Sequence, residues 1–122
     1  MQHLQTGKLG ETFALAWLKN NGYQVLQTNY HCRWGEIDLI AQSGSVLVFV
    51  EVKTRCGNGF GTPQAAVTIS KQKKMSQTAL TYLNEHQITN QDCRFDVIAV
   101  LLSNNGSLRK IELISDAFNF IE

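Results

Sequence analysis

The sequence predicts a mixed α/β fold in which helices flank a central β-sheet. Two segments, residues 6–20 and 70–85, carry apolar side chains at helical spacing, whereas the segments between and after them show the alternating or continuous apolar runs of strands. Two compact turns, Ser43-Gly44-Ser45 and Asn105-Gly106, stand where hairpins would join neighbouring strands. The expected element order is helix, three strands, helix and two strands.

Each element has its own signal in the sequence. In the first helix, Leu9, Phe13 and Trp17 recur every four residues, and Asn21-Gly22 ends the periodic segment. In the second helix, Met75, Ala79, Leu80 and Leu83 mark the apolar side. The predicted strands cover residues 23–27, 34–42, 46–53, 94–102 and 108–114.

The chain length and the cysteine pattern limit the class of protein. A length of 122 residues is that of one ordinary domain, so we expect a single domain over residues 1–122. The three scattered cysteines form no Cys-x-x-Cys pair, which indicates free thiols in a reducing compartment. The longest apolar run, residues 97–102, is too short to cross a bilayer, and the first residues lack the apolar core of a signal peptide. We therefore expect a cytoplasmic protein without membrane contact.

Basic residues gather in the middle of the chain. No acidic residue lies between Glu51 and Glu85, whereas five basic residues do. Such a segment suits a polyanion such as a nucleic-acid backbone, although a solvated helix face would give the same pattern. The candidate nucleic-acid-binding residues are Arg33, Arg55, Lys71, Lys73 and Lys74.

The first predicted hairpin carries charges that a buried strand does not need. Alternation places Glu36 and Asp38 on one face of a strand, and Glu51 and Lys53 on one face of the next. A tight turn about Gly44-Ser45 sets Asp38 opposite Glu51, with Cβ atoms about 5 Å apart. The same register sets Glu36 opposite Lys53. Because both faces of these strands are otherwise apolar, we expect them to be covered, and a covered, unpaired carboxylate costs several kcal/mol.

A bound cation would compensate these carboxylates. Hard divalent ions such as Mg²⁺ or Mn²⁺ prefer carboxylate oxygens. Glu11, beside Ala14 and Leu18 on the first helix, is a candidate third carboxylate if that helix packs on the sheet. A metal and Lys53 suit phosphodiester hydrolysis, because the metal activates a bound water and the lysine orients it or stabilises developing charge. The alternative is an exposed, salt-bridged rim, which makes Asp38→Ala neutral or stabilising and leaves thermal unfolding insensitive to Mg²⁺.

Three blocks of the sequence, GKLGETFALAWL, NYHCRWGEIDLIA and VFVEVKTR, resemble the YraN family of small bacterial proteins, which are similar to archaeal Holliday-junction resolvases. An acidic helix residue, an aspartate and Glu-x-Lys in this order also resemble the PD-(D/E)XK nuclease superfamily. The resemblance implies a restriction-endonuclease-like core with a mixed sheet. It implies that Glu11, Asp38 and Glu51 bind the metal and that these three act with Lys53 in catalysis. Related resolvases act as dimers, so a homodimer is a further expectation.

The sequence thus predicts a Mg²⁺- or Mn²⁺-dependent endonuclease that hydrolyses phosphodiester bonds in DNA, branched DNA included. The alternative is a non-catalytic nucleic-acid-binding protein that retains the nuclease fold. Trp17 and Trp34 are expected to be packing residues, and stacking of Trp34 on a base is the alternative for that side chain.

Overall fold

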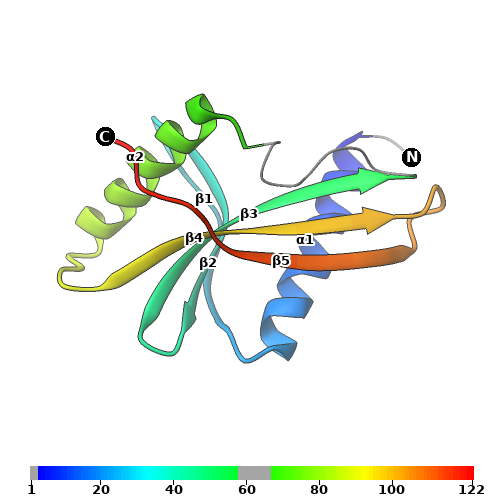
Figure 1. Ribbon diagram of the computed structural model, residues 1–122, viewed down its shortest axis with the longest axis horizontal. Helices are drawn as coiled ribbons and strands as arrows, with labels where there is room; N and C mark the ends of the chain where they lie inside the picture. The colour runs from blue at the N-terminus through cyan, green and yellow to red at the C-terminus, as the bar shows by residue number, and fades with distance from the viewer. Residues whose placement is uncertain (1–2, 58–66) are drawn as a thin grey trace.

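The computed structural model describes residues 3–57 and 67–122, which form two helices and five strands (Figure 1). The order of the elements is the predicted one. Their bounds are α1 His3–Asn20, β1 Gln24–Cys32, β2 Gly35–Ser43, β3 Val46–Cys56, α2 Ile69–Glu85, β4 Asp92–Leu102 and β5 Leu108–Phe118.

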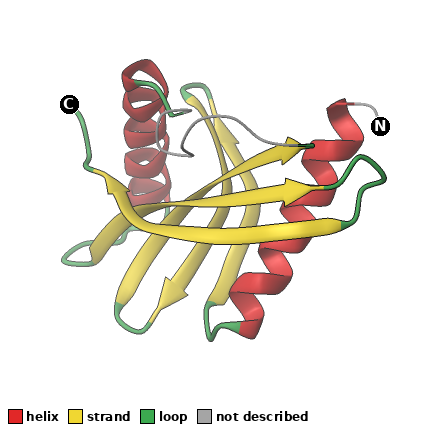
Figure 2. Cartoon of the chain, turned by 45° about the vertical axis from the view of Figure 1, so that its right-hand side comes forward, coloured by secondary structure: helices red, strands yellow, loops and turns green. Residues whose placement is uncertain are grey.

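The five strands form one mixed sheet with the spatial order β1-β2-β3-β4-β5. Strands β3 and β4 are parallel and are joined through α2, whereas the other neighbouring strands are antiparallel. The two helices lie on opposite sides of the sheet (Figure 2). Because both faces of the central strands are covered, β3 reads as a continuous apolar run from Val46 to Val50.

Each helix builds one core with the sheet face that it covers. On one side, Ala14 and Leu18 of α1 are fully buried against the sheet. On the other side, Met75 and Ala79 of α2 are equally buried. The sheet residues of the first core are Leu39, Ala41, Val48, Val50, Ile98, Val100 and Leu102, and those of the second include Ile37, Ile40, Leu47, Phe49, Phe95 and Val97.

The two edge strands are longer than predicted. Strand β1 continues to Cys32, where the prediction stopped at residue 27, and β5 continues to Phe118 rather than residue 114. An edge strand needs backbone pairing with only one neighbour, and most side chains of β1 are exposed or half-buried. The apolar alternation that marks a covered strand is therefore absent from residues 28–32, with the exception of buried Tyr30.

Strands β2 and β3 pair near their turn and then separate. Five residue pairs, from Ser43 with Val46 to Leu39 with Val50, follow the predicted register. Pairing between these two strands ends there, although β2 begins four residues earlier and β3 runs to Cys56. In Figure 1, β1 and β2 turn away from the direction of β3, β4 and β5. We call the place where β2 and β3 separate the fork.

Helix α1 touches β3 directly at Gly10, close to the fork. A Cβ atom added to Gly10 would lie 1.9 Å from Thr54 Oγ1 and 2.9 Å from Thr54 Cβ. Any side chain here would push the helix away from the strand. Glycine costs about 1 kcal/mol in a helix interior relative to alanine, so its presence here is explained by this close approach.

Gly10→Ala is accordingly expected to lower the free energy of unfolding by about 1–3 kcal/mol, the usual cost of overpacking. The matched control is Gly7→Ala in the same helix, because a Cβ there meets no atom within 4 Å. The control is expected to be neutral or to stabilise by up to about 1 kcal/mol. Urea unfolding of both variants measures the difference. Equal stability of the two variants would contradict the contact with Thr54.

A buried carboxylate, Asp96 of β4, forms an ion pair within its own strand and a hydrogen bond to β5, away from the fork. Asp96 is 0% exposed and accepts hydrogen bonds from Arg94 Nε at 3.0 Å and from the backbone N–H of Asp116 at 2.9 Å. Arg94 also donates to the Tyr23 hydroxyl at 3.1 Å. All of these contacts join backbone and side chains of the fold, which gives Asp96 a structural role.

No helix among the described residues combines the length and the apolar character required to cross a bilayer. The cysteines Cys32, Cys56 and Cys93 are free thiols, as their spacing predicted.

Candidate functional site

An open hollow of about 290 Å³ lies at the fork. It is bounded by the first turns of α1, by β2 and by the far half of β3. Its lining residues are Thr6, Gly7, Glu11, Asp38, Glu51, Val52, Lys53, Thr54 and Arg55. The structure therefore brings together Glu11, Asp38, Glu51 and Lys53, the four residues that the sequence singled out.

Asp38 and Glu51 form a carboxyl pair at the bottom of the fork. Glu51 is buried, with 5% of its surface exposed, and the two side chains share a hydrogen bond. The backbone N–H of Val52 also donates to Asp38 Oδ2 at 2.8 Å, so that Asp38 occupies the position where the next backbone pair would have formed. A fully solvated rim does not describe this pair, because only 5% of the surface of Glu51 is exposed.

Burial and the neighbouring carboxylate act in the same direction on Asp38. Burial, the negative charge of Glu51 and the hydrogen bond to Glu51 raise its pKa to about 7, against a smaller lowering by the Val52 N–H. Asp38 thus retains its proton to a higher pH than an ordinary aspartate does. A divalent cation would replace that proton, since both carboxylates would then face a positive charge.

Glu11 approaches this pair from α1. Its Oε1 atom is buried and has no hydrogen-bond partner among the described residues. Burial raises the pKa of the Glu11 carboxyl, and the negative charges of Asp38 and Glu36 raise it further. A buried carboxylate oxygen without a donor is an unsatisfied acceptor, and a cation or a metal-bound water would satisfy it.

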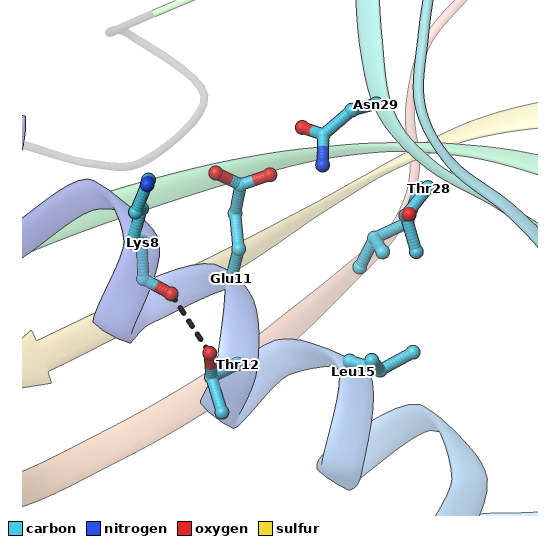
Figure 3. A pocket seen from close by; sticks show the side chains of 7 residues that line it. Lys8, Glu11, Thr12, Leu15, Thr28 and Asn29 are labelled. Carbon is cyan, nitrogen blue, oxygen red and sulfur yellow. Dashed lines mark hydrogen bonds between the residues drawn. The ribbon is translucent and has the colours of Figure 1, made fainter.

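Glu11 also borders a second hollow of about 290 Å³ between α1 and β1. Figure 3 shows the Glu11 side chain rising from α1 between Lys8 and Asn29. The charge of Lys8 lowers the pKa of Glu11, against the larger effects of burial and the other acids. Glu11 therefore stands between the two hollows and not at the centre of the first one.

The three acids do not converge as one compact group. Among the described residues, no three Asp, Glu, His or Cys side chains come close enough together to hold a single metal ion. Asp38 and Glu51 are the two carboxyls in direct contact, and the charge of Asp38 raises the pKa of Glu11. The donor set fits a hard divalent cation that is bound by two carboxylates and completed by water, which is the usual manner for Mg²⁺.

Lys53 projects into the hollow without an acidic partner. The predicted opposition of Glu36 and Lys53 is not observed, because β2 and β3 have already separated where these residues stand. Within residues 3–57 and 67–122, Lys53 forms no ion pair, and Glu36 is exposed and forms none either. The Lys53 ammonium is thus available to an anion that enters the hollow.

Lys71 of α2 pairs with Glu51 from the other side. Its Nζ lies 3.4 Å from Glu51 Oε2, and its side chain is 41% exposed. The sequence predicted Lys71 as a nucleic-acid contact because it lies in the acid-free segment. The position of Lys71 beside Glu51 depends on how α2 crosses from β3 to β4. The spacing of residues 51 and 71 in the sequence does not predict this contact.

The other candidate nucleic-acid-binding residues lie around the hollow rather than in it. Arg55 lines its outer end on β3. Lys73 and Lys74 are exposed on α2, and Arg33 is exposed at the turn between β1 and β2. Lys74 lies against that turn, since a Cβ on Gly35 would be 3.7 Å from Lys74 Cβ.

These features define a small mixed α/β protein with a carboxylate-rich hollow at a fork in its sheet. The family model described as "Uncharacterised protein family UPF0102" matches residues 10–100, and the chain belongs to this family. The predicted resemblance to the YraN-like family is thereby confirmed. The matched range contains Glu11, Asp38, Glu51, Lys53 and Lys71.

Several bacterial relatives carry the same family name. A UPF0102 protein of Syntrophus aciditrophicus is 50% identical over 117 residues, which cover 96% of this chain and 91% of the relative. A UPF0102 protein of Geotalea daltonii is 46% identical, with coverage of 93% and 88%. A third, from Moorella thermoacetica, is 40% identical, with coverage of 97% and 98%. The similarity thus extends over nearly the whole length of both chains.

Proposed function

We propose that this protein is a metal-dependent nuclease that hydrolyses phosphodiester bonds in DNA, branched DNA included. The observation that carries the proposal is the contact between the Asp38 and Glu51 carboxyls in the same hollow as Lys53, which forms no ion pair among the described residues. Two adjacent carboxylates can hold a divalent cation, and the free ammonium beside them can bind an anion. Hydrolysis of a phosphodiester next to a metal ion uses both the bound cation and the group that binds the phosphate.

The arrangement assigns each side chain a task. Asp38 and Glu51 would hold Mg²⁺ or Mn²⁺, with Glu11 beside them as the third acid. When bound, the metal would supply a water of lowered pKa and neutralise charge on the phosphate oxygens. Lys53 would donate a hydrogen bond to the attacking water or to a phosphate oxygen. Arg55, at the outer end of the hollow, would contact the adjacent phosphate of the same strand.

The fold supports the proposal at a coarser level. A helix, three antiparallel strands, a crossover helix and a parallel strand follow the order of a restriction-endonuclease-like core, and the acids stand where two central strands separate. If the substrate is a junction with two strands to cut, two copies of this chain would act together. Sedimentation of the protein with and without junction DNA would measure that association.

Cleavage of labelled DNA tests the function. We expect cuts in linear duplex, single-stranded or four-way-junction DNA with Mg²⁺ or Mn²⁺, and none with EDTA. Glu51→Gln is expected to require at least roughly 10- to 100-fold more metal for the same rate, because loss of even an outer-shell partner of a ligand has that effect. The matched control is Glu112→Gln, whose side chain is 52% exposed on β5.

Three outcomes are distinguishable in this experiment. Cleavage by the wild type and the control, with the higher metal requirement in Glu51→Gln, would support the nuclease. Binding of DNA without cleavage under either metal would reject it in favour of the non-catalytic nucleic-acid-binding protein. Equal cleavage by all three proteins would point to a contaminating nuclease and would contradict the site.

A further inference from the structure

Trp34 is exposed at the turn between β1 and β2, where the sequence predicted a packing residue. It is 39% exposed, although Arg33 lies over its ring with Cζ 4.4 Å from the centroid. By contrast, Trp17 is half-buried beside the core under α1, with its ring 6.3 Å from that of Tyr23. Trp34 therefore presents an aromatic surface and a guanidinium plane to the outside, and the core does not require this side chain.

The surroundings of Trp34 are basic and lead to the hollow. Lys74 of α2 lies against Gly35, the residue that follows Trp34. Lys71 stands three residues earlier on the same helix, which places the two lysines on one face. Lys71 in turn contacts Glu51 at 3.4 Å. Lys71, Lys74 and Arg33 thus lie in succession between Glu51, which lines the hollow, and Trp34, with the exposed Glu36 as an acidic neighbour, and we call these three basic residues the basic row.

We propose that Trp34 is a stacking platform for an unpaired base of a DNA strand whose backbone follows the basic row out of the hollow. This inference rests on the proposed function and names its substrate class, which is DNA with unpaired bases beside the cleavage point. Within a duplex the faces of the bases are covered by their neighbours. A base that is single-stranded or flanks a junction exposes its face and can stack on an indole ring.

The positions along β2 set the distance of that base from the site. Trp34 precedes Asp38 by four residues, and a strand rises about 3.3 Å per residue, so the two are separated by roughly 13 Å. This corresponds to about four steps along a DNA strand at 3.4 Å per step. The unpaired base is therefore expected within a few nucleotides of the cleaved bond.

The charges favour a nucleic acid over an apolar partner. Arg33 and Lys74 flank Trp34, and cations of this kind bind phosphate oxygens on both sides of a stacked base. The same pairing of an aromatic ring with a guanidinium accepts a base through stacking and cation–π contacts. Leu26 of β1 is also apolar and 43% exposed, but it has no such cationic contact among those of the described residues. It therefore serves as a control for the loss of an exposed apolar side chain.

Tryptophan fluorescence offers a direct reading, because the chain contains two tryptophans. In a Trp17→Phe variant, Trp34 is the remaining one. With EDTA present to prevent cleavage, we expect single-stranded and forked oligodeoxynucleotides to quench its emission, and a blunt duplex of two fully complementary strands to leave it unchanged. A base stacked on the indole quenches it, whereas a backbone contact alone does not.

Affinity provides a second reading that does not depend on the Trp17→Phe variant. In fluorescence anisotropy with labelled single-stranded DNA, Trp34→Ala is expected to raise Kd roughly 5- to 150-fold, while Trp34→Phe retains most of the affinity. Leu26→Ala, which removes an exposed apolar side chain of equal exposure, is expected to bind as the wild type does. Trp34 and Leu26 are both exposed, so all three variants should fold.

The outcomes separate this inference from the function on which it rests. Unchanged Kd in Trp34→Ala, together with unquenched emission, would overturn the stacking platform while DNA cleavage remained intact. Quenching by the blunt duplex to the same extent would also overturn it. Failure of the wild type to bind any of these DNAs would reject the proposed function itself and this inference with it.

Discussion

Replacing Lys53 by methionine is expected to lower kcat/KM for DNA cleavage roughly 100- to 1,000-fold, the usual cost of removing one donor to the charge that develops in the transition state. The ammonium lines the hollow and, among the described residues, is not neutralised by an acid. Methionine keeps most of the length and the apolar stem but carries no charge. The loss should therefore appear in the rate and not in the fold.

Two further measurements define the cause of that loss. Lys110→Met removes a lysine that is 68% exposed on β5 and should leave cleavage unchanged. Mg²⁺ binding to Lys53→Met, measured by calorimetry, should be retained, because the metal is held by the acids. If Lys53→Met cleaved DNA at the wild-type rate, this lysine would have no part in the chemistry. If it lost Mg²⁺ binding as well, its role would be to hold the acids in place.

The contribution of Asp38 to the stability of the metal-free protein is expected to fall as the pH rises from about 4 to about 7. The pKa of this carboxyl is 3.8 for an ordinary aspartate and about 7 in the folded chain. Between these values the folded state retains a proton that the unfolded state has released. Each increase in pH in this window therefore favours unfolding, by up to roughly 1.4 kcal/mol per pH unit.

A comparison with Asp38→Asn isolates this contribution from that of the other acids. Asparagine is neutral at every pH and can still accept from the Val52 N–H and donate to Glu51. Below about pH 4 the two proteins should have similar free energies of unfolding, whereas at pH 8 the variant should be the more stable one. Urea unfolding at a series of pH values measures the difference. A constant difference across the series would contradict the raised pKa of Asp38.

Magnesium should reduce this difference at pH 8. A ligand that binds the folded state at 100 times its Kd stabilises it by about 2.7 kcal/mol, and it requires both carboxylates to be deprotonated. The wild type should therefore gain stability with Mg²⁺, and Asp38→Asn should gain little. If Mg²⁺ had no effect on the wild type, the acids would not form a metal site.

Much of the fold follows from patterns that the sequence contains. The hairpin register was predicted from alternation and from the turn at Gly44, and the five pairs between β2 and β3 confirm it. The contact between Asp38 and Glu51 is a consequence of that register. The full lengths of β1 and β5 were not predictable in the same way, because edge strands need little apolar patterning.

The rest of the candidate site depends on contacts between elements that are distant in the sequence. The position of Glu11 is set by the approach of Gly10 to Thr54, and the position of Lys71 by the crossover of α2. Glu36 is separated from Lys53 because β2 and β3 diverge before these residues. The register predicted from the turn does not indicate where two paired strands diverge. Gly10, inside the first helix, was the one local signal of this close approach, since a glycine is favourable in a helix interior only where another element lies in contact with it.

The pairing of β3 with β4 connects the site to a strand that contributes no side chain to it. The side chains of the hollow, together with Lys71, all come from the first 71 residues. Yet β3 is paired along its full length, from Val46 with Asp92 to Cys56 with Leu102, by a strand that follows α2. A chain that ended after α2 would hold every reactive group and would leave one side of β3 as an open edge. The shape of the hollow therefore also depends on β4, although no residue of β4 lines it.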